Sequence, residues 1–186
     1  MNTNNRGSAS LRASAAVDSK REMHLALLVK HRYLVECFGA DGKRKWSEEF
    51  DNLVVTAGRN KYLDATLKTG LASPAWYVGL KGSGSVVAGD TMASHSGWTE
   101  LVPYSNANRP TWTPGSIASG SVDNSASKAA FSINASATVV GCFMADNNTK
   151  SGTSGTLFGG GDFGTSRGVE SGDTLNVTVT CSLTSS

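Results

Sequence analysis

Charged side chains are scarce in this chain of 186 residues: Asp, Glu, Lys and Arg make up 17% of it, against about 25% in an ordinary soluble domain. Proline is also rare, with 4 residues, whereas glycine is abundant, with 21. Many of the other residues are Ser, Thr, Ala and Asn, and this balance suits turns and short strands better than long surface helices. The composition therefore predicts a β-rich protein.

Long hydrophobic runs are missing as well. No run approaches the about 20 apolar residues that span a bilayer, and no N-terminal stretch combines a charged start, an apolar core and a cleavage site. We therefore expect no membrane partner and no secretion by that route, so the glycosylation-like sequences at Asn134, Asn147 and Asn176 carry no weight. The formal net charge of +2 is too small to indicate a nucleic-acid partner.

Cysteine is equally sparse. The three residues Cys37, Cys142 and Cys181 are odd in number, widely spaced and set in apolar or alternating runs. We interpret them as small buried hydrophobic residues, because a chain of this length can bury a core without disulfides or a metal.

Residues 1–22 contain almost no large apolar side chains and cannot bury enough surface to offset the entropy of ordering. We expect a flexible N-terminal arm there, ahead of a single β-rich domain at residues 23–186. The arm carries four basic residues, which are Arg6, Arg12, Lys20 and Arg21. They are candidate contacts to an acidic surface of a partner; the alternative is an ordinary disordered terminus.

Period-two alternation of apolar residues predicts a β-hairpin over residues 29–50, with a two-residue turn at Asp41-Gly42. Thr56 is a candidate N-cap for a helix of about three turns that ends at Gly70, and its apolar face, which includes Leu63 and Leu67, is expected in the core. Further strands are predicted at residues 76–80, 98–102, 109–113, 128–136, 138–145, 156–158 and 174–183. The expected fold is mainly β: an antiparallel β-sandwich or jelly-roll-like body with one short helix and an extended N-terminal arm.

The groups that could support catalysis have better structural interpretations. His95 lies in the stretch GDTMASHSGWTEL. The groups near it that would be needed for a Ser-His-Asp arrangement are Asp90, Ser94, Ser96 and Glu100. Such triads take their residues from separate strand ends and turns, whereas these share one short loop. We expect a structural turn, with Asp90 capping a short helical segment and Trp98 packed inward.

Ligand-binding motifs give a similar result. The glycine-rich stretches at residues 81–85 and 159–161 lack the spacing of a phosphate-binding loop and are expected in loops or at sheet edges. His24 and His31 have no partners at metal spacing, and the oxygen ligands of residues 146–148 and Asp162 do not form an EF-hand pattern. We therefore expect no enzyme activity and no catalytic, metal-binding or cofactor-binding residues.

Aromatic residues offer the main candidate for a binding surface. Five of them cluster within 37 residues: Trp76, Tyr77, Trp98, Tyr104 and Trp112. If exposed, they could stack on sugar rings or anchor a protein partner. If buried, they are part of the core.

Four parts of the chain after Tyr33 follow one another in a characteristic order: YLVECFGADGKRKWSEEFDNLVVTAGRNKYLDATLKTG, then WYVGLKGSG, then GDTMASHSGWTEL with YSNANRP, and finally GTLFGGGDF with GDTLNVTVT. This order of hairpin, short helix and Gly/Ser/Thr-rich strands resembles the small structural proteins of tailed bacteriophages. The resemblance covers about four-fifths of the chain and assigns no residue a role.

The resemblance implies a virion protein, made in the cytoplasm of the bacterial host. The leading interpretation is a capsid cement or decoration protein that stabilises the shell by protein–protein contacts, as a homo-oligomer bound to the major capsid protein or other virion proteins. Its arm would dock on a neighbouring subunit. The alternative is a tail, neck or fibre-associated adaptor or a carbohydrate-binding module that uses the aromatic residues.

Overall fold

The computed structural model describes residues 27–68 and 74–185, and the predicted arm at residues 1–22 lies outside them. The described residues form eleven strands and one helix. In chain order these are β1 (Leu27–Phe38), β2 (Arg44–Asp51), β3 (Leu53–Val54), α1 (Thr56–Leu67), β4 (Trp76–Gly84), β5 (Trp98–Leu101), β6 (Thr111–Trp112), β7 (Ser121–Asp123), β8 (Ala129–Ser132), β9 (Ala137–Ala145), β10 (Leu157–Val169) and β11 (Thr174–Ser185).

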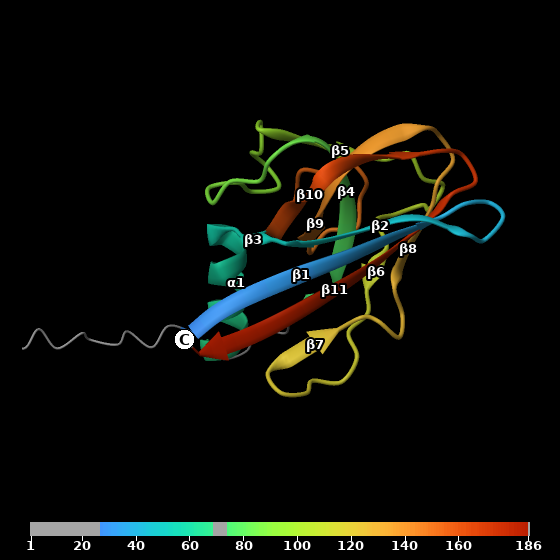
Figure 1. The fold of residues 1–186 in the computed structure, drawn as a ribbon. Coiled ribbons are helices and arrows are strands. Elements are labelled where there is room, and N and C mark those ends of the chain that lie inside the picture. The colour runs from blue at the N-terminus through green and yellow to red at the C-terminus, as the bar shows by residue number, and fades with distance from the viewer. Residues whose placement is uncertain (1–26, 69–73, 186) are drawn as a thin grey trace, which may run out of the picture.

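The strands form two antiparallel sheets that make a β-sandwich (Figure 1). Sheet A has the order β2-β1-β11-β7, and β8 also pairs with β11; sheet B has the order β3-β10-β9-β4-β5, and β6 also pairs with β4. The predicted mainly β fold with one short helix is confirmed. β1 and β11 pair along their whole length, from Leu27 opposite Ser185 to Phe38 opposite Thr174, so the start and the end of the described chain lie side by side.

The predicted opening hairpin is present as β1 and β2, but its loop is longer than two residues. The Gly39 N–H donates to the Lys43 carbonyl at 2.9 Å, which leaves Ala40, Asp41 and Gly42 as the loop. Gly42 has a φ of 75°, the left-handed conformation that closes a three-residue hairpin loop. The turn residues were therefore found, but Gly42 takes the third loop position and not the second.

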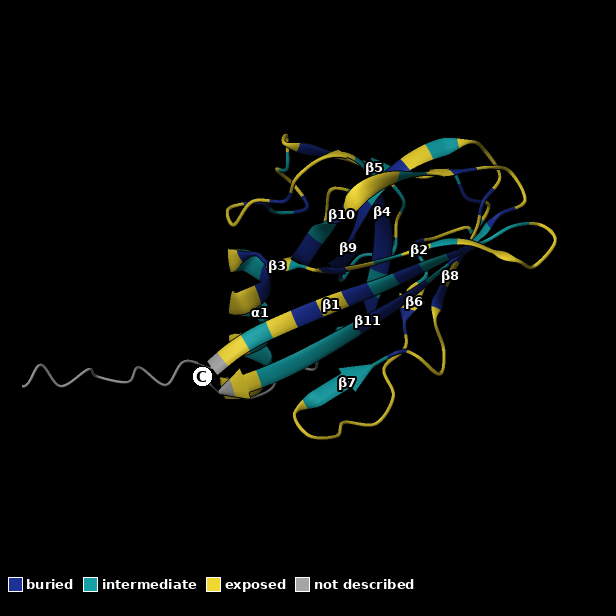
Figure 2. Ribbon diagram, in the orientation of Figure 1, coloured by how far each residue is buried: buried dark blue, intermediate teal, exposed yellow. Residues whose placement is uncertain are grey.

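The main core lies between the sheets. Inward side chains of β1 such as Tyr33 and Val35 are fully buried, and they meet Val177 and Val179 of β11 and residues of sheet B such as Val78. Figure 2 shows buried residues of β1 alternating with exposed residues and, toward the end of the strand, with intermediate ones, as expected for a strand with one wet face.

Sheet B is buried on its second face too. Phe143 in β9 alternates with the core residues beside it, so it points to the opposite face. There it packs with Met92 and Trp98, and with Val55 just before α1. The segment from Val86 to Trp98 therefore covers this face of the sheet.

The glycines at residues 159–161 correct an expectation. They do not lie in a loop or at an edge but inside β10, between β3 and β9. A Cβ on Gly159 would lie 2.3 Å from the Leu53 carbonyl oxygen, and one on Gly160 would lie 2.9 Å from that of Cys142. Glycine is used here because the backbones approach too closely for side chains. Residues 81–84 likewise belong to β4.

The helix is confirmed at Thr56–Leu67, but two of its predicted details are wrong. The N-cap is Val55, without a side-chain cap, and Thr56 is already helical. Leu63 and Leu67 were expected in the core, yet they are 50% and 78% exposed. The expected end at Gly70 lies outside the described residues.

The helix approaches β10 through its backbone at Gly58, where a Cβ would lie 2.1 Å from the Phe158 carbonyl oxygen. Alanine is a better helix former than glycine by about 1 kcal/mol, but this clash is with a backbone atom that cannot turn aside. We expect Gly58→Ala to lower the free energy of unfolding, measured in urea, by about 1–3 kcal/mol. Gly89→Ala is the control, because no atom lies within 4 Å of the added methyl group; equal stability of the two variants would contradict this account.

Candidate functional sites at the two ends of the sandwich

The five candidate surface aromatics are mostly not at the surface. Trp76, Trp98, Tyr104 and Trp112 are 8%, 2%, 1% and 9% exposed, and Tyr77 is half-buried. The indole N–H of Trp112 donates to the Val179 carbonyl at 3.0 Å and that of Trp98 to Asp90 at 3.0 Å. The indole N–H groups of Trp112 and Trp98 are thus satisfied inside, and all four buried rings belong to the core. Of the two alternatives, burial in the core therefore holds for four of the five candidates, and exposure does not.

Arg109, close to these aromatics in sequence, is structural. It is 1% exposed and binds the Glu100 carboxylate with two hydrogen bonds, 2.8 Å from Nε and 2.7 Å from Nη2. Its Nη1 also donates to the Asn147 carbonyl at 2.8 Å. A buried charge is tolerated when it is paired in this way. The pair holds the loop after β9 against β5.

The residues near His95 do not form a triad. The His95 ring stacks on Trp98 with a centroid distance of 4.0 Å, and Asp90 accepts hydrogen bonds from the Trp98 indole and from the Val87 N–H. Glu100 is held by Arg109. Trp98 packs inward as predicted, but residues 91–95 form turns in place of the expected helical segment. The group therefore stabilises the cover of sheet B.

The interpretation of the cysteines as buried hydrophobic residues is confirmed for Cys37 and Cys142, whereas Cys181 is half-buried. All three are free thiols. Burial raises the pKa of Cys37 and of Cys181 to about 12, and that of Cys142 well above its usual value. The thiols therefore stay protonated at neutral pH and are not poised as nucleophiles or metal ligands.

Within residues 27–68 and 74–185, no three His, Cys, Asp or Glu side chains are grouped closely enough to hold a metal ion. The carboxylates considered for calcium have other partners: Asp146 accepts the Thr156 N–H at 2.5 Å, and Asp162 pairs with the buried Lys81. None of the helical residues described forms a segment long and apolar enough to cross a membrane.

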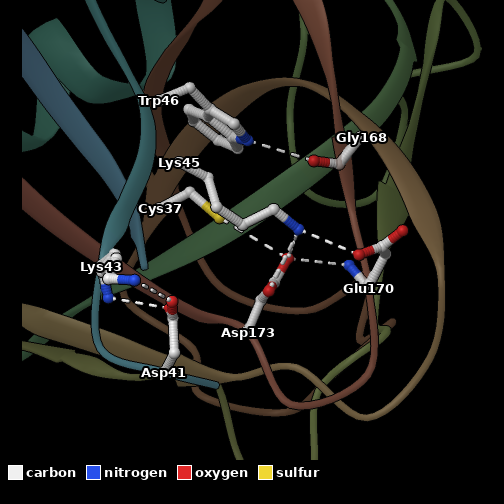
Figure 3. A network of polar contacts seen from close by, with 8 residues as sticks. All are labelled: Cys37, Asp41, Lys43, Lys45, Trp46, Gly168, Glu170 and Asp173. Atoms are coloured by element: carbon white, nitrogen blue, oxygen red, sulfur yellow. Dashed lines mark hydrogen bonds and ion pairs between the residues drawn. The ribbon is translucent and has the colours of Figure 1, made fainter. Parts of the chain in front are cut away.

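One end of the sandwich holds a polar network, drawn in Figure 3. Asp173, 4% exposed, accepts hydrogen bonds from the Lys45 ammonium at 2.9 Å and from the Glu170 N–H at 2.9 Å, and the Cys37 thiol lies 3.7 Å from the same oxygen. Burial acts to raise the pKa of Asp173, but these donors outweigh it and the pKa is lowered. The network ties the β1–β2 hairpin to the turn before β11.

An open hollow of about 620 Å³ lies beside this network and is lined by Lys45, residues 136–138 and residues 168–170. Its lysine is already engaged by Asp173 and by Glu170, the latter at 3.1 Å. The Trp46 indole N–H also bonds internally, to the Gly168 carbonyl at 3.1 Å. We therefore interpret this end as a structural clasp.

The opposite end holds an apolar pocket of about 400 Å³. It lies between the sheets, beside α1, where β1 begins and β11 ends (Figure 1). Five strands each contribute an apolar residue to its lining: Val29, Trp76, Met144, Phe158 and Leu183. Ile117, which is 79% exposed, lines it from the loop before β7. Apolar walls of this kind fit an apolar side chain or ligand group.

His31 is the titratable group of this pocket. It is 2% exposed, and its ring stacks on Phe158 with a centroid distance of 4.6 Å. Burial lowers its pKa to about 4, so the imidazole is neutral at pH 7 and adds no charge to the pocket. The sequence contained a signal for this position, because His31 has the same strand parity as Val29 and Tyr33, which point inward.

The four candidate arm residues, Arg6, Arg12, Lys20 and Arg21, lie outside the described residues. Comparison of the sequence with protein-family models and with curated proteins finds no match. The polar clasp could not have been predicted from local sequence, since Lys45 and Asp173 are brought together only by the sheet.

His31 predicts how stability depends on pH. Folding lowers the pKa of His31, so the unfolded chain binds the proton more tightly than the folded one. The contribution of His31 to the free energy of unfolding is therefore fully present above pH 6.5 and is lost as the pH decreases toward 4. The loss over this range should be about 3 kcal/mol. In His31→Phe, which keeps an aromatic ring against Phe158, urea denaturation at several pH values should show a flat profile there. A wild-type profile without the slope would contradict a buried neutral histidine.

Asp173→Asn should lower the free energy of unfolding by about 1–3 kcal/mol at pH 7, because a buried charge-assisted network is lost. Glu170→Gln, at a carboxylate whose side chain is 75% exposed, should change it by less than about 0.5 kcal/mol. A lowered pKa stabilises the fold above the pKa of the unfolded group, so the Asp173→Asn difference should shrink below about pH 4. An equal effect of the two substitutions in urea denaturation would show that the clasp does not depend on burial.

Proposed function

We propose that the chain is a structural protein of a tailed-bacteriophage particle, a capsid cement or decoration protein that acts by binding its neighbours. The observation that carries this proposal is the apolar end of the sandwich, which no residue of 27–68 and 74–185 covers. Ile117 and Leu67 are 79% and 78% exposed, and the apolar pocket lies between the loop of Ile117 and α1. Exposed apolar groups beside such a pocket are typical of a protein–protein contact surface.

The chemistry of the described body favours binding over catalysis. Three buried carboxylates that could take part in a reaction are committed to internal contacts: Glu100 to Arg109, Asp90 to Trp98, and Asp173 to Lys45. The thiols are held protonated by burial. These contacts make a rigid sandwich whose working parts are its surfaces, as a component that reinforces a shell requires.

The arm supplies a second contact in this proposal. Its basic residues outnumber its acidic ones, and it joins the body at Leu27, beside the apolar pocket. A segment that becomes ordered on a neighbour can lock two subunits together with little added bulk. The major capsid protein, or a further copy of this chain, is the partner that a cement protein would meet.

The burial of Trp76, Trp98, Tyr104 and Trp112 removes the surface on which a carbohydrate-binding role was based. A tail, neck or fibre adaptor would use the same kind of protein contacts as a cement protein. Location on the particle therefore distinguishes the two.

The test is to separate phage particles that contain this chain into DNA-filled heads and free tails and to measure its copy number in each by mass spectrometry. We expect many copies in heads and few in tails. Deletion of residues 1–22 should reduce the number bound and lower the temperature at which heads release DNA. The chain found only in tails would favour the adaptor, and its absence from particles would refute the proposal. Heads unaffected by the deletion would rule out the role of the arm.

A further inference from the structure

We infer that the apolar pocket at the start of β1 is the receptor for the N-terminal arm of a second copy of this chain, and that Leu11 is the side chain it takes. This inference deepens the proposed function, because it names the partner and the contact through which copies join. It depends on three features: the composition of the pocket, the place where the arm joins the body, and the distribution of apolar residues in the arm.

The pocket is built for an apolar side chain. Its volume of about 400 Å³ equals that of about a dozen water molecules. Its walls include Val29, Trp112, Met144 and Leu183, and its histidine, His31, is buried and stacked on an aromatic ring. The Trp112 indole N–H is already bonded to a backbone carbonyl. Water in such a space finds few partners, so an apolar group that displaces it is favoured.

The arm joins the body at this pocket. Leu27 pairs with Ser185, and the neighbouring residues Val29 and Leu183 line the cavity. The 26 residues before Leu27 therefore begin at its rim. Residues just ahead of β1 would have to reverse direction to enter the pocket of their own body, whereas an extended chain leads away from it.

The arm has few apolar residues to offer. Between residues 2 and 22 the large ones are Leu11 and Val17, and the rest are mostly small or polar. Leu11 lies 16 positions before Leu27, a span of up to about 55 Å when extended. A body of this size has a radius of gyration of about 15 Å, so Leu11 can reach the equivalent pocket of an adjacent copy. Reciprocal exchange fills both pockets and closes the assembly with two-fold symmetry.

The first test compares substitutions on both sides of the contact, in the full chain. Leu11→Asp in the arm and Ile117→Asp at the rim should each weaken self-association about tenfold to a hundredfold for each of the two symmetry-related contacts, because every contact loses one buried leucine-sized side chain. Ser14→Asp and Val102→Asp are the matched controls and should associate as wild type does. Light scattering after size-exclusion chromatography gives the mass, and circular dichroism checks that each variant is folded.

The second test mixes the two defective variants. The Leu11→Asp chain keeps an intact pocket and the Ile117→Asp chain keeps an intact arm. The mixture should therefore form a one-to-one complex that is about tenfold to a hundredfold tighter than the self-association of either variant, because one arm–pocket contact stays intact. Because Trp76 and Trp112 line the pocket, tryptophan emission should move to shorter wavelength as the complex forms.

Other results would overturn the inference. A monomeric wild type that loses stability with Leu11→Asp would show that the arm occupies its own pocket. Variants that associate like wild type, or a mixture that does not associate, would show that the pocket has a different occupant. Heads that still bind the Leu11→Asp chain in full number would leave the proposed function standing without this contact.

Discussion

The antiparallel pairing of β1 with β11 is the constraint on which the rest of the structure depends. It joins the first and the last described residues of the chain over 12 paired positions. Closing so long a loop costs chain entropy, and burial of inward residues such as Tyr33, Val35 and Val177 offsets it. Every other strand has to fit between these two in sequence, so sheet B is built from the segment that they enclose.

The same pairing creates the two ends of the sandwich, and they differ. At one end β2 turns back on β1, and Lys45 reaches Asp173 to close the sheets with a polar clasp. At the other end β2 pairs with β1 only as far as Arg32, so the start of β1 extends beyond its neighbour. The sheets are not closed there by side chains of the described body, and the apolar pocket remains.

A protein that functions by binding through its surface needs a folded body whose conformation stays constant. Here the charges that are buried are paired, as in Arg109 with Glu100, and sheet B is covered on both faces. Close backbone contact along the glycines of β10 adds to this density. The end that the described residues leave open is the one with the apolar pocket, which α1 and the loop of Ile117 both line.

The sequence by itself determined the opening hairpin, the helix, most strands and the burial of Cys37 and Cys142, because alternation and turn residues are local signals. Only the tertiary structure decided that the tryptophans are core, that Gly159 lies inside a strand and that Leu67 is exposed. Each of these depends on contacts between parts distant in the chain: a facing sheet covers the tryptophans, an adjacent backbone approaches Gly159, and none of the other described elements covers Leu67. The pocket follows the same rule, since its walls come from both sheets and exist only once β1 and β11 have paired.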